Sequence, residues 1–175
     1  MTPLSQQCCK NQSFTEQQIH NMTRSITTNI TISAPPSKVR AVFLDFSAHS
    51  EWNPFMVSIA VHKPPGATPD PGTQLKITLK LESGMTSVMY PIVLENSKEL
   101  FRWKGKLMFD LLFAGEHSFE FLPFTGDDGT MQTRFVQAET FGGVLVPLFG
   151  GILKQTEKSF KLLNQALKER VEGMQ

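Results

Sequence analysis

The feature of this sequence that most constrains its fold is a change in the spacing of apolar residues near residue 145. Upstream, in segments such as QLKITLKLE (74–82), apolar and polar residues alternate, which is typical of strands with one face on a core. From roughly 145 to 171 the apolar residues recur at steps of three and four, which predicts one long amphipathic helix. Its inward face is formed by Phe149, Leu153, Thr156, Phe160, Leu163 and Leu167. A set of strands followed by a single long helix favours an α+β fold.

Seven segments carry the alternation, or the β-branched and aromatic residues, that are typical of strands. They are residues 25–33, 56–63, 74–82, 85–95, 99–107, 109–122 and 130–141. Two short helices are expected between the first two strands, in APPSKVRAVFLDF and AHSEWNPF. Pro91 in the fourth segment indicates a bulge or an edge position. An antiparallel sheet of about seven strands curls through its twist, and a long helix in its concave face would leave a hydrophobic cavity between them.

Composition and the N-terminal segment limit the class of protein. Residues 1–24 are expected to be a polar tail, and residues 25–175 a single ligand-binding domain. The tail lacks the apolar centre of a signal peptide, and no stretch reaches the roughly 18 apolar residues of a membrane helix. We therefore expect a cytoplasmic protein with no integral membrane segment. A formal net charge of +1 offers no field that would attract nucleic acid. The adjacent Cys8 and Cys9 argue against a disulfide framework.

Four polar or amphipathic side chains fall on the predicted inner face of the last three strands. Period-two alternation places them together among aromatic residues: Trp103, His117, Gln137 and Glu139. A Glu139–His117 pair in a dry cavity could move a proton, so these two are the candidate catalytic residues. The alternative is that the two side chains satisfy each other and only hold the strands together. Gln137 and the Trp103 indole N–H could donate hydrogen bonds to a carbonyl oxygen of a ligand.

Aromatic residues form the rest of the predicted binding site. The sequence has fourteen phenylalanines and one tyrosine, which suits a lining for greasy molecules or simply a core. The candidate lining residues are Phe113, Phe135, Phe149, Phe160 and Tyr90. A weaker group lies near the second short helix, namely His49, Glu51, Trp52 and Asn53, in which Trp52 and Asn53 fit a structural role better. The histidines lack metal-ligand spacing and there is no glycine-rich phosphate loop, so no metal and no cofactor are expected.

Several stretches of the sequence resemble one known superfamily. They are ISAPPSKVRAVFLDFSAHSEWNPF, PIVLENSKELFRWKGKL, GEHSFEF, and TRFVQAETFGG followed by the long helix. They resemble the helix-grip superfamily called SRPBCC, which includes START lipid-transfer domains, birch-pollen-allergen-type proteins and aromatic polyketide cyclases. The resemblance covers about residues 25–171 and is strongest to the branch named polyketide cyclase/dehydrase. It implies a curved antiparallel sheet around a long C-terminal helix.

Two functions fit these features, and both require a hydrophobic small molecule as the partner. The first is a cofactor-independent cyclase of natural-product biosynthesis, acting on a polyketide- or terpenoid-like intermediate by cyclisation, dehydration or a pericyclic step. The second is a non-catalytic carrier or sensor of a lipid-like ligand. A protein-interaction role is a third possibility, and the oligomeric state stays open.

Overall fold

The computed structural model describes residues 23–106, 114–142 and 150–174. Its helices and strands follow one another as β1 (Thr23–Ile32), α2 (Pro36–Leu44), the 3₁₀ turn η1 (Phe46–Ala48), α3 (His49–Trp52), β2 (Met56–Lys63), β3 (Gln74–Lys80), β4 (Thr86–Met89), β5 (Ile92–Asn96), β6 (Leu100–Lys106), β7 (Ala114–Thr125), β8 (Met131–Gly142) and α4 (Gly150–Glu172).

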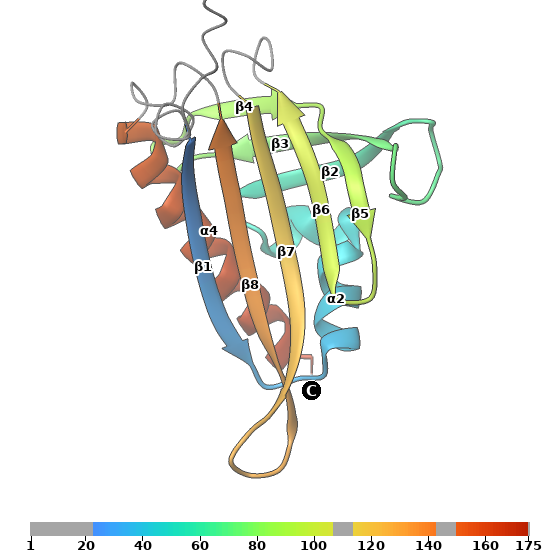
Figure 1. Ribbon diagram of the computed structural model, residues 1–175, viewed down its shortest axis with the longest axis vertical. Coiled ribbons are helices and arrows are strands. Elements are labelled where there is room, and N and C mark those ends of the chain that lie inside the picture. The colour runs from blue at the N-terminus through green and yellow to red at the C-terminus, as the bar shows by residue number, and fades with distance from the viewer. Residues whose placement is uncertain (1–22, 107–113, 143–149, 175) are drawn as a thin grey trace, which may run out of the picture.

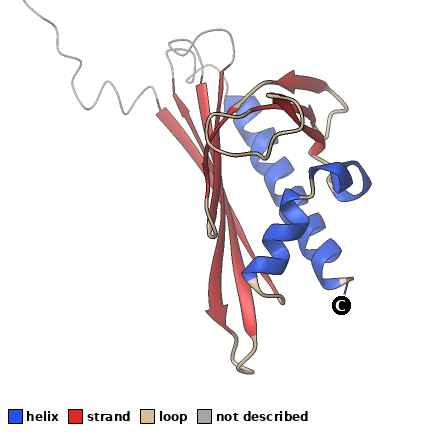
Figure 2. Ribbon diagram, turned by 90° about the vertical axis from the view of Figure 1, so that its right-hand side faces the viewer, coloured by secondary structure: helices blue, strands red, loops and turns tan. Residues whose placement is uncertain are grey.

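The strands of the described residues form one antiparallel sheet of eight strands. Its order is β1-β8-β7-β6-β5-β3-β2, with β4 paired to β3 beside this path (Figure 1). Helices α2 and α4 lie on the same side of the sheet, and β2, β3 and β4 curl over toward that side (Figure 2). The prediction of a curled antiparallel sheet wrapped on a long C-terminal helix is confirmed.

The prediction of one continuous strand over residues 85–95 is wrong. The structure divides it into β4 and β5, with Tyr90 and Pro91 between them. Pro91 has no N–H for a ladder hydrogen bond, but its carbonyl oxygen accepts one from the backbone N–H of Leu75 (2.9 Å). The chain therefore remains attached to β3 at Pro91 while it changes direction. This break adds the eighth strand to the seven that the sequence pattern predicts.

Helix α4 covers the concave face of the sheet with the stripe that the sequence predicts. Its buried residues recur at helical spacing and are Thr156, Ser159, Phe160, Leu163, Asn164, Leu167 and Val171. Near its end, Lys168 donates from Nζ to the carbonyl oxygen of Thr31 (2.9 Å), and Glu172 accepts from the backbone N–H of Ser33 (2.8 Å). These bonds fix the helix against β1. The first residues of the predicted helix, 145–149, lie outside the described residues.

Phe43 of α2 is the centre of an aromatic core between that helix and the sheet. Its ring lies 4.5 Å from Phe119, 5.7 Å from Phe121 and 5.9 Å from Phe135, measured between ring centroids. The side chains of all four phenylalanines are fully buried. Burial of such large apolar side chains provides much of the driving force for packing α2 on β7 and β8.

A buried histidine and asparagine connect α2, α3 and β2. The Nε2–H of His49 donates to the carbonyl oxygen of Phe43 (2.6 Å), and the Asn53 amide donates to His49 Nδ1 (3.0 Å). Asn53 Oδ1 also accepts from the backbone N–H groups of Phe55 (3.0 Å) and Met56 (2.9 Å). Burial lowers the pKa of His49, which keeps the ring neutral. In the weaker candidate group of the sequence, these two residues are therefore structural.

Replacement of Asn53 by alanine tests this role. Asn53→Ala leaves His49 Nδ1 and two backbone N–H groups without their partner, so the free energy of unfolding should fall by about 2–4 kcal/mol. Glu51→Ala is the matched control, because its carboxylate, on the same short helix, forms a solvent-exposed ion pair with Arg170 (2.7 Å). The free energy of unfolding of this control variant should fall by less than about 1 kcal/mol. Urea titration measures both changes, and equal losses would contradict the structural role of Asn53.

Candidate functional site

The strand register places three predicted site residues in one row across the concave face. Trp103 of β6 lies opposite His117 of β7, and His117 lies opposite Glu139 of β8. Gln137 points to the same face two residues before Glu139, since β8 alternates. Trp103, His117 and Gln137 are buried, and the Glu139 side chain is 13% exposed. These four residues are called the interior polar group below.

The His117 ring is held on both faces by phenylalanines. It stacks on Phe119 (4.3 Å) and on Phe160 of α4 (4.7 Å), and Trp103 meets it edge-on (5.3 Å). The Gln137 amide nitrogen donates to His117 Nε2 (3.0 Å), which leaves the ring proton on Nδ1. That Nδ1–H faces Glu139 Oε2 at 3.7 Å, a close approach that is longer than a hydrogen bond.

Burial determines the protonation of both groups. Removal from water raises the pKa of the Glu139 carboxyl to about 8 and lowers the pKa of the His117 imidazole to about 3. Near neutral pH the pair is therefore a carboxylic acid beside a neutral imidazole. A carboxylic acid of this kind can donate a proton at a pH at which an ordinary glutamate is already ionised.

Gly115 provides the space for the Glu139 carboxyl. A Cβ atom on Gly115 would lie 2.5 Å from Glu139 Oε1, so a side chain at 115 would require the carboxyl end of Glu139 to shift from its present place. Gly105 lies opposite Gly115 on β6, and a Cβ there would instead meet the flexible end of Met89 (2.4 Å). Gly115 has the same strand parity as His117, but a glycine carries no signal that would have identified this role.

Three buried polar atoms near α4 and the row have no hydrogen-bond partner among the described residues. They are Trp103 Nε1, Gln137 Oε1 and Asn164 Oδ1. Asn164 of α4 uses its amide nitrogen to donate to Thr28 Oγ1 of β1 (3.0 Å), and Thr28 lies opposite Gln137 in the sheet. Thr28 and Asn164 are not among the site residues predicted from the sequence. Strand parity with Ile26 and helical spacing from Phe160 would have placed both on the inner face.

The structure places only some of the other predicted lining residues near the interior polar group. Phe135 and Phe160 are fully buried, Phe135 in the aromatic core and Phe160 against His117. Tyr90 is 47% exposed and its ring lies against His62 (5.0 Å), so the structure does not bring it to the interior polar group. Phe113 and Phe149 lie outside the described residues.

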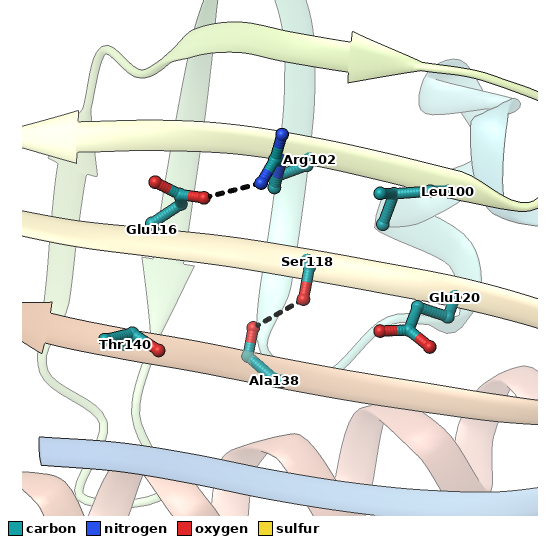
Figure 3. Close-up of a pocket in the computed structure, with 7 residues that line it drawn as sticks. All are labelled: Leu100, Arg102, Glu116, Ser118, Glu120, Ala138 and Thr140. Atoms are coloured by element: carbon teal, nitrogen blue, oxygen red, sulfur yellow. Dashed lines mark hydrogen bonds and ion pairs between the residues drawn. The ribbon is translucent and has the colours of Figure 1, made fainter.

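Two hollows lined by described residues lie away from the interior polar group. One, of about 160 Å³, is on the convex face of the sheet, where Arg102 bonds Glu116 (2.9 Å), as Figure 3 shows. The other, of about 200 Å³, lies between β3 and α4 and includes Phe55 and Ser159. Neither is lined by His117 or Glu139, and the cavity expected between helix and sheet stays a prediction.

Residues 23–106, 114–142 and 150–174 contain neither a metal-binding cluster nor a membrane-spanning helix. In these ranges, no three histidine, cysteine, aspartate or glutamate side chains gather in a way that could hold a metal ion. A bilayer-spanning helix needs a long apolar stretch, and the helices of these ranges contain none.

The fold and the site together define a helix-grip protein with an acid–imidazole pair on the inner face of its sheet. The chain belongs to the family described as polyketide cyclase / dehydrase and lipid transport, whose model matches residues 23–172. The resemblance inferred from the sequence is thereby confirmed. A comparison with curated protein sequences gave no match.

Solved structures share the fold at low sequence identity. A START superfamily protein from Mycobacterium smegmatis has a TM-score of 0.65 and 18% identity, over 86% of this chain and 99% of that one. The Zhui aromatase/cyclase from Streptomyces sp. R1128 has a TM-score of 0.65 and 12% identity, over 86% and 94%. The di-domain aromatase/cyclase BexL of the BE-7585A biosynthetic pathway has a TM-score of 0.63 and 15% identity, over 86% of this chain. This chain spans half the length of BexL.

The shifted pKa values predict how stability depends on pH. The pKa of Glu139 is raised from 4.5 to about 8, so unfolding releases a proton between these values and stability falls as pH rises through that window. The pKa of His117 is lowered from 6.5 to about 3, so unfolding takes up a proton and stability falls as pH drops through that window. The two effects together place maximum stability between roughly pH 4.5 and 6.5.

Glu139→Gln should remove the loss of stability at higher pH. Between the pKa of Glu139 in the unfolded chain and its pKa in the folded protein, the free energy of unfolding of the wild type should decrease relative to that of the variant. The decrease should be up to about 1.4 kcal/mol per pH unit. Urea titrations at several pH values measure the difference. Glu120→Gln, on the convex face of β7, is the control and should keep the wild-type slope. Parallel curves for wild type and Glu139→Gln would show that the folded protein does not hold this carboxyl protonated.

Proposed function

We propose that this protein binds a hydrophobic small molecule between the sheet and α4 and catalyses its cyclisation or dehydration without a cofactor. The observation that carries the proposal is the Glu139 carboxyl, which is buried 3.7 Å from the His117 imidazole and has a pKa of about 8. Near neutral pH this carboxyl therefore keeps a proton that it can donate to a bound molecule. The substrate is a polyketide- or terpenoid-like intermediate with a hydroxyl and a carbonyl group.

Glu139 acts as the acid in the proposed dehydration. It gives its proton to the hydroxyl group of the substrate, which leaves as water. The carboxylate that results then takes a proton from the neighbouring carbon, and the electrons of that C–H bond form the double bond. Glu139 ends the cycle protonated, as it began. The reaction therefore consumes no cofactor and no external base.

The neighbours of Glu139 support both of its charge states. His117 keeps its proton on Nδ1, because Gln137 donates to Nε2, and this N–H can stabilise the carboxylate while it exists. The Trp103 indole N–H has no partner among the described residues and can donate to a substrate carbonyl, which makes the adjacent carbon easier to deprotonate. The apolar rings around the pair exclude water and hold a flexible substrate in few conformations.

The comparisons support a function of this class. The family description names polyketide cyclases and dehydrases together with lipid transport. Two structures of the same fold, Zhui and BexL, are described as aromatase/cyclases. A hydrophobic small molecule is the shared partner of both activities in the family name. The family therefore supports ligand binding in general, and the interior polar group favours catalysis.

One observation favours a second candidate function, that of a non-catalytic carrier. The His117 ring has a phenylalanine on each face, at 4.3 and 4.7 Å, so a ligand has to displace the Phe160 ring to touch it. A carrier needs only an apolar interior in which the Phe160 ring can move aside for the ligand. In that case Glu139 and His117 serve the packing of β7 on β8, and no bond of the ligand changes.

Metabolite analysis in the source organism distinguishes the two functions. The gene is deleted and then restored as wild type, as Glu139→Gln or as Glu120→Gln, and extracts are compared by untargeted mass spectrometry. For a dehydrating cyclase, deletion and Glu139→Gln should both replace one product by an isomer or by a species heavier by one water. Glu120→Gln, on the convex face, should restore the product to about the wild-type level.

The carrier function gives a different pattern. Deletion would then change only the amount or distribution of a lipid, and Glu139→Gln would behave like wild type as long as the protein folds. The cellular level of each variant, measured by immunoblot, separates loss of chemistry from loss of protein. A Glu139→Gln strain with normal protein level and normal products would overturn the catalytic proposal.

A further inference from the structure

We infer that the ligand of this protein is electrically neutral at its buried end and carries there an acceptor for Trp103 Nε1–H and a hydroxyl donor for Gln137 Oε1 or Asn164 Oδ1. The inference rests on the proposed function, because it assumes that a hydrophobic molecule enters between the sheet and α4. It names the chemical class of that molecule. Hydroxy ketones and similar neutral oxygenated compounds belong to this class, and lipid carboxylates do not.

Among the residues whose side chains the structure describes, no lysine or arginine is buried. The buried polar residues among those described are Thr28, His49, Asn53, Thr73, His117, Thr133, Gln137, Thr156, Ser159 and Asn164, and none is a lysine or an arginine. The segments 107–113 and 143–149, LMFDLLF and GVLVPLF, also contain neither residue. Burial lowers the pKa of His117 to about 3, so its ring offers no positive charge near neutral pH before a ligand binds. An anionic ligand group would therefore meet no lysine or arginine among the described buried side chains.

Glu139 also disfavours an anionic ligand group relative to a neutral one. Its carboxyl is the acid of the interior polar group, and a second carboxyl close to it would have to share or take up a proton. A fatty acid at about pH 7 is almost entirely ionised, and its protonation before binding would weaken its affinity about a hundredfold. A neutral alcohol of the same chain length avoids this penalty.

Three buried polar atoms on the inner side of the sheet and on α4 lack a hydrogen-bond partner among the described residues. Trp103 Nε1 offers a donor, and Gln137 Oε1 and Asn164 Oδ1 offer acceptors, all three buried and without a partner among the described residues. Thr28 connects the two acceptor residues, since it accepts from the Asn164 amide and lies opposite Gln137. Buried polar groups are nearly always hydrogen-bonded in folded proteins. A ligand with both a hydroxyl and a carbonyl group would complete these bonds, and a pure hydrocarbon would not.

Calorimetric titration of the full chain with three ligands of equal length tests the inference. The ligands are dodecanol, dodecanoate and dodecylammonium, at about pH 7. Dodecanol should bind more tightly than dodecanoate by about a hundredfold, and more tightly than dodecylammonium. Trp103→Phe keeps an aromatic ring but removes the donor, and should weaken dodecanol binding by about fivefold or more. Trp52→Phe is the matched control, because Trp52 Nε1 is also buried and unpartnered but lies beside His49. It should leave the affinity unchanged.

Each outcome has a distinct meaning. Dodecanoate binding as tightly as dodecanol would overturn the inference, because the interior would then accommodate an anion. Tightest binding of dodecylammonium would also overturn it, and would make Glu139 a counter-ion for a cationic ligand. Equal effects of Trp103→Phe and Trp52→Phe would overturn the assignment of Trp103 as the donor. No binding of any of the three would instead overturn the proposed binding function, and the inference would fail with it.

Discussion

The exclusion of water by α4 is the constraint on which the interior of this protein depends. Phe160 of α4 covers the ring of His117, and the sheet closes the other side. Charge is costly in such a place, so the carboxyl of Glu139 and the imidazole of His117 both stay neutral near neutral pH. One residue earlier along β7, on the convex face, Glu116 meets Arg102 as an ion pair in contact with solvent. Glu116 of β7 and Glu139 of β8 thus lie on opposite faces of the sheet, the first paired with a cation in contact with solvent and the second buried beside a neutral ring.

The two histidines that are buried among the described residues differ in how completely their surroundings are hydrogen-bonded. Both nitrogens of His49 are hydrogen-bonded, one to Phe43 and one to Asn53, and Asn53 completes its own bonds with backbone N–H groups. Around His117 the bonding is incomplete, since Glu139 lies beyond hydrogen-bond length and atoms of Trp103 and Gln137 have no partner among the described residues. Completed bonds hold a fold in one state. Incomplete ones leave donors and acceptors for a bound molecule.

Much of the fold could be predicted from the sequence, because the spacing of apolar residues along a strand or helix indicates which of its faces is buried. The inner faces of β6, β7 and β8 and the stripe of α4 follow this rule, and parity alone placed His117 and Glu139 on one face. The rule fails where the backbone changes direction. Pro91 divides one predicted strand into two, and this is why Tyr90 lies outside the core although the sequence suggested it for the site. Thr28 and Asn164 were missed because a threonine in a strand and an asparagine in a helix are common in solvated positions.

Gly115 has a consequence for how such a site can evolve. The Glu139 carboxyl fills the volume that a side chain at 115 would need, so on this backbone the two positions are not independent. A lineage that acquires alanine or a larger residue at 115 must move or lose the carboxyl, and a lineage without the carboxyl is free to fill the gap. Related sequences should therefore show the two positions changing together. The presence of glycine at 115 then becomes a mark by which relatives that keep a buried carboxyl at 139 can be separated from those that keep only the fold.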